Sequence, residues 1–253
     1  MVNALFPALT AVDGMFASFL PALLRVSIWG GIAGAIAMFV YKFTSNQAAI
    51  ARLKAETRDL RRRMLDPDLE QAEFGRLIRV NLKTSFSLLG RTLLPGLVST
   101  VPVLLLAAWL STFYAYVVPP NGEPVRLRVE PQAMAVAIEP ANRVAGRDGT
   151  DWDITPSPAG ETLTIVAAGV TAYTGNPFAP PVPEIAKRQW WNALLASEAG
   201  YLNPDAGIDL VLIDLPPRRL VGGVPDWLAG WEAPYFLGIL VVAVALKFGL
   251  KIE

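Results

Sequence analysis

Two charged side chains interrupt an otherwise uncharged N-terminal region, and they are the first candidates for chemistry. Asp13 and Arg25 are the only charged residues before Lys42. A guanidinium does not lose its proton in a protein and is costly near the centre of a bilayer. We therefore expect Arg25 to face a helix-bundle interior or a water-filled groove. The sequence leaves open the alternative that Arg25 snorkels toward the outer headgroups beside Pro21.

The composition limits the reactions that this chain can perform. It contains no histidine and no cysteine, which excludes Ser-His-Asp and Cys-His nucleophile systems, disulfides and the usual zinc sites. We expect no catalytic residue, no metal and no cofactor. Asp148, Asp151 and Asp153 lack the spacing of a standard calcium loop and predict a solvated turn. An enzyme in residues 119–230 remains an alternative, although no P-loop, dinucleotide fingerprint or paired-carboxylate motif supports it.

The elements that must position these residues are membrane helices. The chain has 253 residues, of which 53% are hydrophobic and 17% charged, with a mean hydropathy of +0.40. Three apolar runs, residues 16–41, 92–118 and 233–250, are each long enough to cross a hydrocarbon core of about 30 Å. We expect three transmembrane helices, the first of them retained because no signal-peptidase site is evident.

The distribution of charge predicts the orientation. Residues 42–91 carry eleven Lys/Arg against six Asp/Glu, a net charge of +5, and residues 119–230 carry eight against thirteen, a net charge of −5. Loops rich in Lys/Arg stay in the cytoplasm. We expect a multi-pass protein of the cytoplasmic (inner) membrane, with its N-terminus outside and its C-terminus inside.

Residues 42–91 have the pattern of an antiparallel helical hairpin. Apolar residues at heptad-like spacing are followed by three arginines and then by the hairpin turn. For the second helix of the hairpin we predict Asp66 as the N-cap, Pro67 as the first helical residue and Asp68 in the first turn. The alternative is a solvated connector. The residues concerned are Ile50, Leu53, Thr57, Leu60 and Met64 for the seam, Arg61, Arg62 and Arg63 for the basic end, and Phe74, Leu77, Ile78, Leu82, Phe86 and Leu89 for an apolar stripe leading into the second span.

Four residues in the spans predict how helices pack, and a fifth lies at the membrane edge. Gly30 and Gly34 form a small-xxx-small pair that would let another helix approach closely. Pro95 and Pro102 would bend the second span and free carbonyls that need partners. Arg91 is expected to be an interfacial anchor.

Residues 119–230 change in character and predict a β-rich outer domain. Residues 125–138, 162–173 and 208–215 are expected to form strands, and residues 184–199 an amphipathic helix. The predicted fold class is an α-helical membrane protein of three spans with a cytoplasmic antiparallel hairpin and an extracytoplasmic α+β or sandwich domain between spans two and three. The predicted divisions are 1–41, 42–91, 92–118, 119–230 and 231–253.

The order of these parts is similar to the core of the YidC/Oxa/Alb insertase superfamily, in particular its three-span branch, which includes small prokaryotic YidC-like proteins and the insertase subunit of the endoplasmic reticulum membrane complex. The run Leu88-Leu89-Gly90-Arg91-Thr92-Leu93-Leu94-Pro95-Gly96-Leu97 resembles the junction between hairpin and span in that branch. Residues 231–252, with Pro234-Tyr235-Phe236, resemble its closing span. The large segment between spans two and three departs from the family pattern.

This resemblance implies a membrane insertase or membrane chaperone, with Arg25 lining a hydrophilic groove and client membrane proteins as partners. The alternative is a structural or adaptor subunit of an envelope complex, bound to a fixed membrane-protein partner through the outer domain and the hairpin. The lipid bilayer is a partner in either case. A weak ribosome contact through the basic hairpin is a minor alternative, and no DNA contact is expected.

Overall fold

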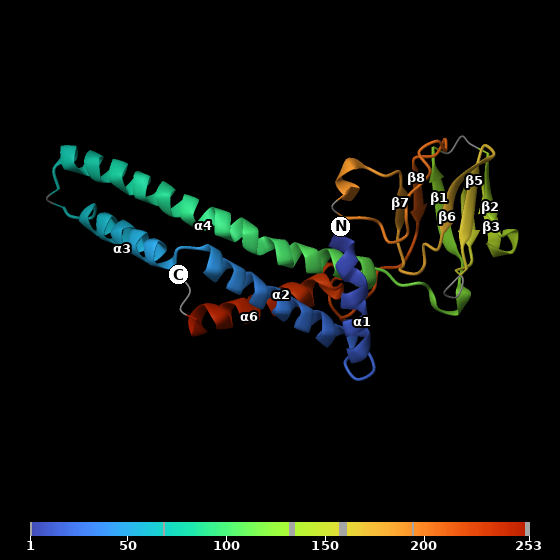
Figure 1. Cartoon of the computed structure of the whole chain (residues 1–253), viewed down its shortest axis with the longest axis horizontal. Coiled ribbons are helices and arrows are strands. Elements are labelled where there is room, and N and C mark those ends of the chain that lie inside the picture. The colour runs from blue at the N-terminus through green and yellow to red at the C-terminus, as the bar shows by residue number, and fades with distance from the viewer. Residues whose placement is uncertain (1, 68, 132–134, 157–160, 194, 251–253) are drawn as a thin grey trace. The chain divides into compact units, whose positions relative to one another are not determined.

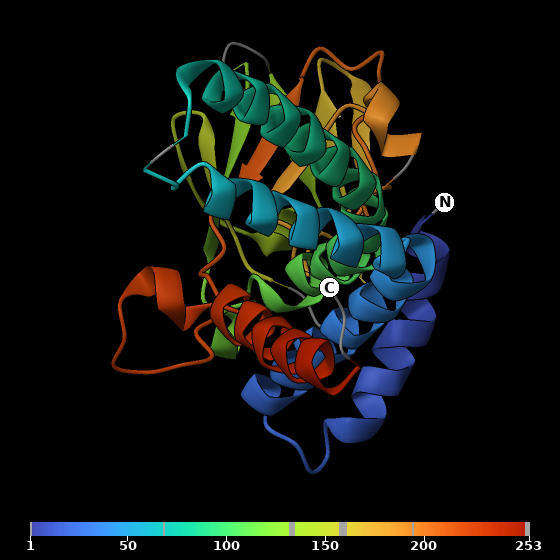
Figure 2. The same ribbon diagram turned by 90° about the vertical axis from the view of Figure 1, so that its left-hand side faces the viewer.

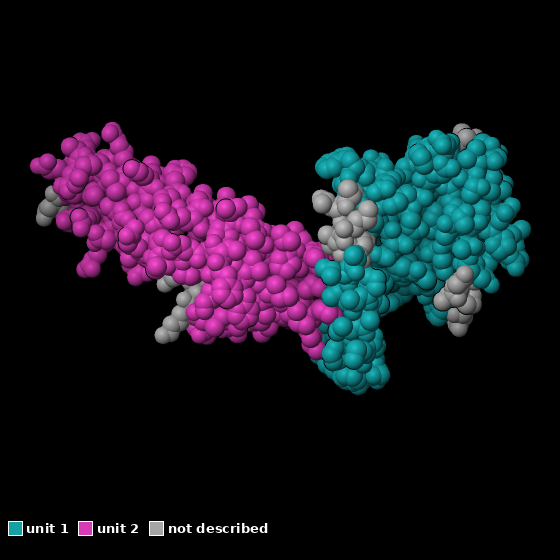
Figure 3. All heavy atoms as spheres, viewed as in Figure 1, with its two compact units in different colours: residues 1–25, 107–233 teal, residues 26–106, 234–253 magenta. Residues whose placement is uncertain are grey.

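A computed structural model describes residues 2–67, 69–131, 135–156, 161–193 and 195–250 (Figure 1). The chain forms two compact units, residues 1–25 with 107–233 and residues 26–106 with 234–253 (Figure 3). Asp68 lies outside the described residues.

Among the described residues, three helices are long and apolar enough, by length and composition, to cross a membrane: α2 (Ala22–Thr44), α4 (Gln71–Tyr114) and α6 (Glu232–Gly249). The three expected apolar helices are therefore present. The first helix starts later than predicted. Residues 6–16 form a separate helix, α1 (Phe6–Phe16), which ends in a turn, and α2 begins directly after Pro21. Proline disfavours continuing a helix through the preceding residue, which explains the interruption.

The hairpin consists of α3 (Gln47–Arg63) and the first half of α4, which lie side by side (Figures 1 and 2). Asn46 caps α3, its side chain accepting a hydrogen bond from the Ala49 N–H at 3.0 Å. Across the pair, the Thr84 hydroxyl donates to the Glu56 carboxylate at 3.3 Å. In α3 and the first half of α4, the buried side chains among the described residues are Ile50, Thr57, Leu60, Leu77 and Thr84.

The predicted cap of the second hairpin helix is wrong. α4 begins at Gln71, and its first hydrogen bond runs from the Phe74 N–H to the Glu70 carbonyl at 2.9 Å. Asp66 and Pro67 instead form the connecting turn, in which the Asp66 carbonyl accepts from the Leu69 N–H at 3.3 Å. Because the turn uses this backbone carbonyl locally, the helix starts beyond it.

The β domain contains two antiparallel sheets that share one buried core. One has the order β3-β4-β1-β8-β7 and the other β2-β5-β6. In β1 (Val125–Glu130), Val125, Leu127 and Val129 point into the core and the alternate residues are exposed. The remaining strands are β2 (Val136–Glu139), β3 (Val144–Asp148), β4 (Asp151–Ile154), β5 (Leu163–Ala167), β6 (Val170–Gly175), β7 (Glu184–Ala186) and β8 (Leu210–Ile213).

In this domain one sequence prediction, the helix over residues 184–199, is wrong, and another, the turn near Asp148, is part of a β-hairpin. Residues 184–199 are not one helix, because Glu184–Ala186 form β7 against β8 and only Trp190–Ala193 make a 3-10 turn. The predicted solvated turn corresponds to the β3–β4 hairpin, whose turn residues 149 and 150 lie between Asp148, which is exposed, and Asp151, while Asp151 and Asp153 themselves belong to β4. Asp151 lies 3.1 Å from Arg128 on β1, and this hydrogen bond lowers the pKa of Asp151. Backbone pairing of β7 with β8, which is distant in the sequence, overrides the local helical pattern of residues 184–199.

Candidate functional site

Arg25 forms an internal ion pair with the other charge of the N-terminal region. The turn between α1 and α2 brings its Nη1 atom within 2.7 Å of the Asp13 carboxylate and 3.2 Å of the Asp13 carbonyl. The two side chains are only 14% and 11% exposed. Arg25 thus has a carboxylate partner in the same unit.

The end of α4 completes this arrangement. The Tyr114 hydroxyl donates a hydrogen bond of 2.6 Å to the same Asp13 oxygen, and the guanidinium of Arg25 lies 5.6 Å from the Tyr114 ring centre. One turn earlier, the Trp109 indole N–H donates to the Thr10 hydroxyl at 3.0 Å. A helix with two anchor points on α1 is fixed both in position and in rotation.

A second arginine reaches Tyr114 from the segment that follows β8. The guanidinium of Arg218 lies 5.4 Å from the Tyr114 ring centre, and its backbone N–H donates to the Ala115 carbonyl at 2.8 Å. We call Asp13, Arg25, Tyr114 and Arg218 the Asp13 cluster. It connects α1, α2, the end of α4 and the return from the β domain.

The chemistry available to the Asp13 cluster is electrostatic. A buried ion can be tolerated only when it is paired and hydrogen-bonded. The Asp13 carboxylate accepts from both Arg25 and Tyr114, and an arginine does not act as a base. The cluster is therefore suited to holding helices together. The expectation that Arg25 lines a groove stays a prediction.

The structure places Gly30 and Gly34 against α6. A Cβ atom on Gly30 would collide with the Tyr235 carbonyl oxygen, and one on Gly34 would lie 2.8 Å from the Ile239 carbonyl oxygen. On the facing helix, a Cβ on Gly238 would collide with the Ser27 carbonyl oxygen. The backbones of α2 and α6 are in direct contact, as small residues allow.

Both candidate prolines of the second span lie inside α4, which is helical from Gln71 to Tyr114. Pro95 is buried and Pro102 half-buried. One residue beyond Pro102, the carbonyl of Val103 accepts a hydrogen bond of 2.7 Å from the hydroxyl of Tyr235. Tyr235 is fully buried, and through it α6 contacts both α2 and α4.

The basic candidates of the hairpin lie on its surface. Arg61, Arg62 and Arg63 end α3 and are exposed, and Arg63 pairs with Asp59 at 2.9 Å. Arg91 is exposed along α4. An exposed ion pair of this kind contributes about 0–1 kcal/mol, so these side chains are not needed to hold the hairpin together.

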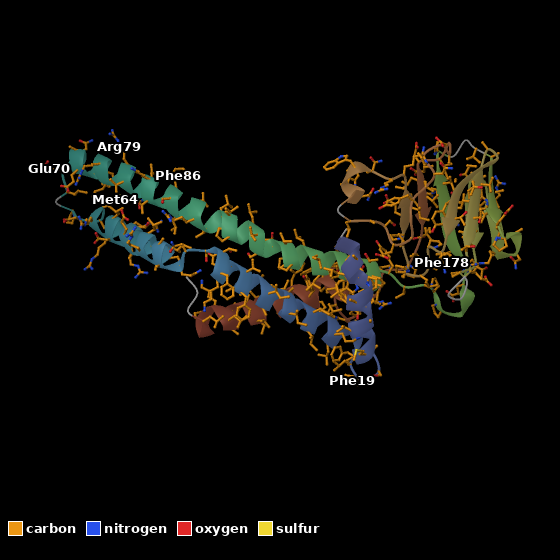
Figure 4. All side chains as sticks on the ribbon, viewed as in Figure 1. Phe19, Met64, Glu70, Arg79, Phe86 and Phe178 are labelled. Atoms are coloured by element: carbon orange, nitrogen blue, oxygen red, sulfur yellow. The ribbon has the colours of Figure 1, made fainter. Side chains whose placement is uncertain are left out.

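One face of α4 carries an unbroken row of exposed apolar side chains, which we call the α4 stripe. Its members are spaced by three or four residues and are 38% to 71% exposed. Phe86 and the neighbouring Arg79 extend from the side of α4 that faces away from α3 (Figure 4). The stripe consists of Phe74, Ile78, Leu82, Phe86, Leu89, Leu93, Leu97, Val101 and Leu104.

Sequence reasoning missed the partners in the Asp13 cluster. The available signal was the isolation of Asp13 and Arg25: two opposite charges twelve residues apart in an apolar region favour each other as partners. Nothing local pointed to Tyr114 or Arg218. Within the described part of the chain, no three carboxylates gather in a way that could hold a metal ion.

No family model matches this chain, and neither a curated protein sequence nor a solved structure is significantly similar to it. The resemblance to the YidC/Oxa/Alb superfamily therefore stays a prediction from the sequence.

Proposed function

We propose that this protein is a membrane insertase or membrane chaperone of the YidC/Oxa type, without enzymatic activity, in the cytoplasmic membrane. The observation that carries the proposal is the α4 stripe. The α4 stripe runs along one continuous helix, from the hairpin half of α4, which is suited to water, to the apolar half, which is suited to lipid.

The length of α4 indicates which part of the α4 stripe would extend beyond a bilayer. Its 44 residues make a rod of about 66 Å at about 1.5 Å per residue, against a hydrocarbon core of about 30 Å. If Tyr114 marks the outer edge, the core ends near Arg91. The part of the stripe from Phe74 to Leu89 then projects into the cytoplasm, on the side that the +5 charge of the hairpin favours.

An apolar face in water is costly unless something covers it. A client segment that leaves water could lie along Phe74, Ile78, Leu82 and Phe86 and then follow the same face toward the lipid-facing residues. Each step would bury apolar area, at about 25 cal/mol per Å². The surface would thus provide a continuous path from water to lipid.

The test compares two exposed apolar positions on the same turn of α4. Ile78 belongs to the stripe and Val80 does not, and both side chains are 38% exposed. After depletion of the protein, proteomics of the envelope should show the loss of short-tailed membrane proteins. Wild type and Val80→Ser should restore them, and Ile78→Ser and Phe86→Ser should not. The proposal fails if depletion removes no such proteins or if all variants restore them equally.

The role of Arg25 needs a separate comparison, because Arg25→Ala also leaves Asp13 unpaired. The double variant Asp13→Leu/Arg25→Leu removes both charges. Loss of clients in the single variant but not in the double variant assigns Arg25 a structural role. Loss in both assigns it the groove role that the resemblance implies.

The second candidate is a structural or adaptor subunit of an envelope complex. The pairing of Arg25 with Asp13 at 2.7 Å favours it, because a structural protein needs no free cation in the bundle. It predicts stoichiometric co-purification with a fixed partner after mild detergent extraction. An unaltered monomer under those conditions counts against it.

A further inference from the structure

A cavity of about 410 Å³ lies between the end of α4 and the beginning of α6, within one compact unit. Its wall comes from the residues that leave the second span, the return from the β domain and the residues that enter the third span. The residues that matter for its chemistry are Tyr116, Arg218, Arg219, Asp226, Trp227, Trp231 and Glu232. α4 and α6 are long and apolar enough to cross a membrane, so in a bilayer their ends at this cavity would lie at its edge.

The two arginines of the cavity differ in their partners. Arg219 binds the Asp226 carboxylate at 2.7 Å and the Val224 carbonyl at 3.2 Å. Arg218 stacks on Tyr114, and its Nε atom is buried without a hydrogen-bond partner. Among the described residues Arg218 has no carboxylate partner. It is the cation of this wall that is available to a ligand.

The cavity also offers one carboxylate. Asp226 is occupied by Arg219, whereas Glu232, in the first turn of α6, has no ion-pair partner among the described residues. The side chain of Glu232 lies over Gly230, where a Cβ atom would collide with it. With Arg219 and Asp226 neutralising each other, the wall presents one positive and one negative group.

Aromatic side chains complete the wall. Trp227 is 76% exposed and Trp231 is 8% exposed. Tryptophan is enriched at the level of lipid headgroups, and its ring face attracts ammonium groups. A cavity of this size falls within the range of about 300–1,000 Å³ that is common for small-molecule sites.

We propose that this cavity binds the headgroup of a zwitterionic phospholipid, with the phosphate at Arg218 and the ammonium at Glu232 beside the two tryptophans. The paired charges match a phosphodiester joined to an amine. An anionic headgroup without an amine would leave Glu232 unbalanced. The site is independent of the hairpin and of the proposed insertase function.

The experiment uses the full-length protein, delipidated in detergent and titrated with dioleoyl phosphatidylethanolamine or dioleoyl phosphatidylglycerol. Native mass spectrometry counts the bound lipid. Wild type should retain the ethanolamine lipid at lower concentration, and Arg218→Gln should weaken this binding by about tenfold, because a charge-assisted contact to phosphate is lost. Glu232→Gln should remove the preference between the two lipids. Arg147→Gln, which changes an exposed arginine of β3 that does not line the cavity, is the control and should change binding less than about twofold.

Competition distinguishes the source of the headgroup. Soluble glycerophosphoethanolamine at the same concentration should not displace the lipid, because it lacks the acyl chains that the bilayer edge supplies. Equal retention of both lipids by wild type overturns the proposal, as does unchanged binding by Arg218→Gln or full displacement by the soluble compound. Glu232→Gln changes an exposed side chain, so its result remains readable if Arg218→Gln does not fold.

Discussion

The ion pair between Asp13 and Arg25 should behave as a buried pair, and a matched surface pair in the same protein provides the comparison. Arg25 and Asp13 are 2.7 Å apart with side chains 14% and 11% exposed. Arg219 and Asp226 are also 2.7 Å apart, but their side chains are 54% and 91% exposed. The two ion pairs therefore have the same N–O distance and differ in how far their side chains are buried.

Removing one member of the buried pair leaves the other charge without compensation. We expect Arg25→Leu to lower the free energy of unfolding by about 3–5 kcal/mol. The double variant Asp13→Leu/Arg25→Leu should cost only about 1–3 kcal/mol, the penalty for the Tyr114 hydroxyl that loses its acceptor. Arg219→Leu should cost about 0–1 kcal/mol.

The assay is reversible unfolding of the full-length protein in mixed micelles, followed by tryptophan fluorescence and circular dichroism. A complete cycle with Asp13→Leu yields the coupling energy of the pair. The reasoning is refuted if Arg25→Leu and Arg219→Leu cost the same, or if the double variant is no more stable than Arg25→Leu.

Three further predictions follow from single contacts. Gly30→Ala should destabilise the α2–α6 contact, because the new Cβ atom collides with the backbone of α6. Gly31→Ala should lower the stability less, because its Cβ atom meets only a side-chain methyl group at 3.1 Å. Thermal unfolding of both variants in detergent measures the difference. Tyr235→Phe should lower the free energy of unfolding by about 1 kcal/mol through loss of its hydrogen bond to α4, and a value near zero in the same assay would contradict it. Burial raises the pKa of Tyr173 to about 12, so the neutral form is favoured in the folded state and stability should fall as pH rises from about 10 to 12, by on the order of 2 to 3 kcal/mol. Tyr173→Phe should reduce the alkaline loss of stability by that amount in a pH titration, and an unchanged loss between wild type and variant would contradict the prediction.

The three long apolar helices and the β domain could be predicted because their signals are local. Length and hydropathy indicate α2, α4 and α6, and the alternation of Val125, Leu127 and Val129 indicates β1. The strands with weaker alternation were missed. The aspartates of β3 and β4 are residue types typical of turns, and only the sheet brings Arg126 and Arg128 of β1 opposite Asp153 and Asp151 of β4.

The failures have different physical causes. Residues 184–199 have an apolar pattern that suits a helix, but Ile185 gains a strand partner and a place in the core from β8, which is distant in the sequence. Asp66 and Pro67 suit a helix start, yet the turn uses them and α4 begins at Gln71. In the first case a local preference of a fraction of a kcal/mol yields to tertiary contacts, and in the second a local turn takes the place of the expected first helical turn.

By itself the sequence indicated three helices that are long and apolar enough to cross a membrane, because the lengths of its apolar runs depend on no distant contact. It also placed a single cation, Arg25, in the first of these runs. Only the tertiary structure decided what that cation does, since Asp13, Tyr114 and Arg218 come together from separate segments of the chain. Burial and pairing of a charge are properties of neighbours in space, and for that reason the chemistry of Arg25 could not be read from its position in the sequence.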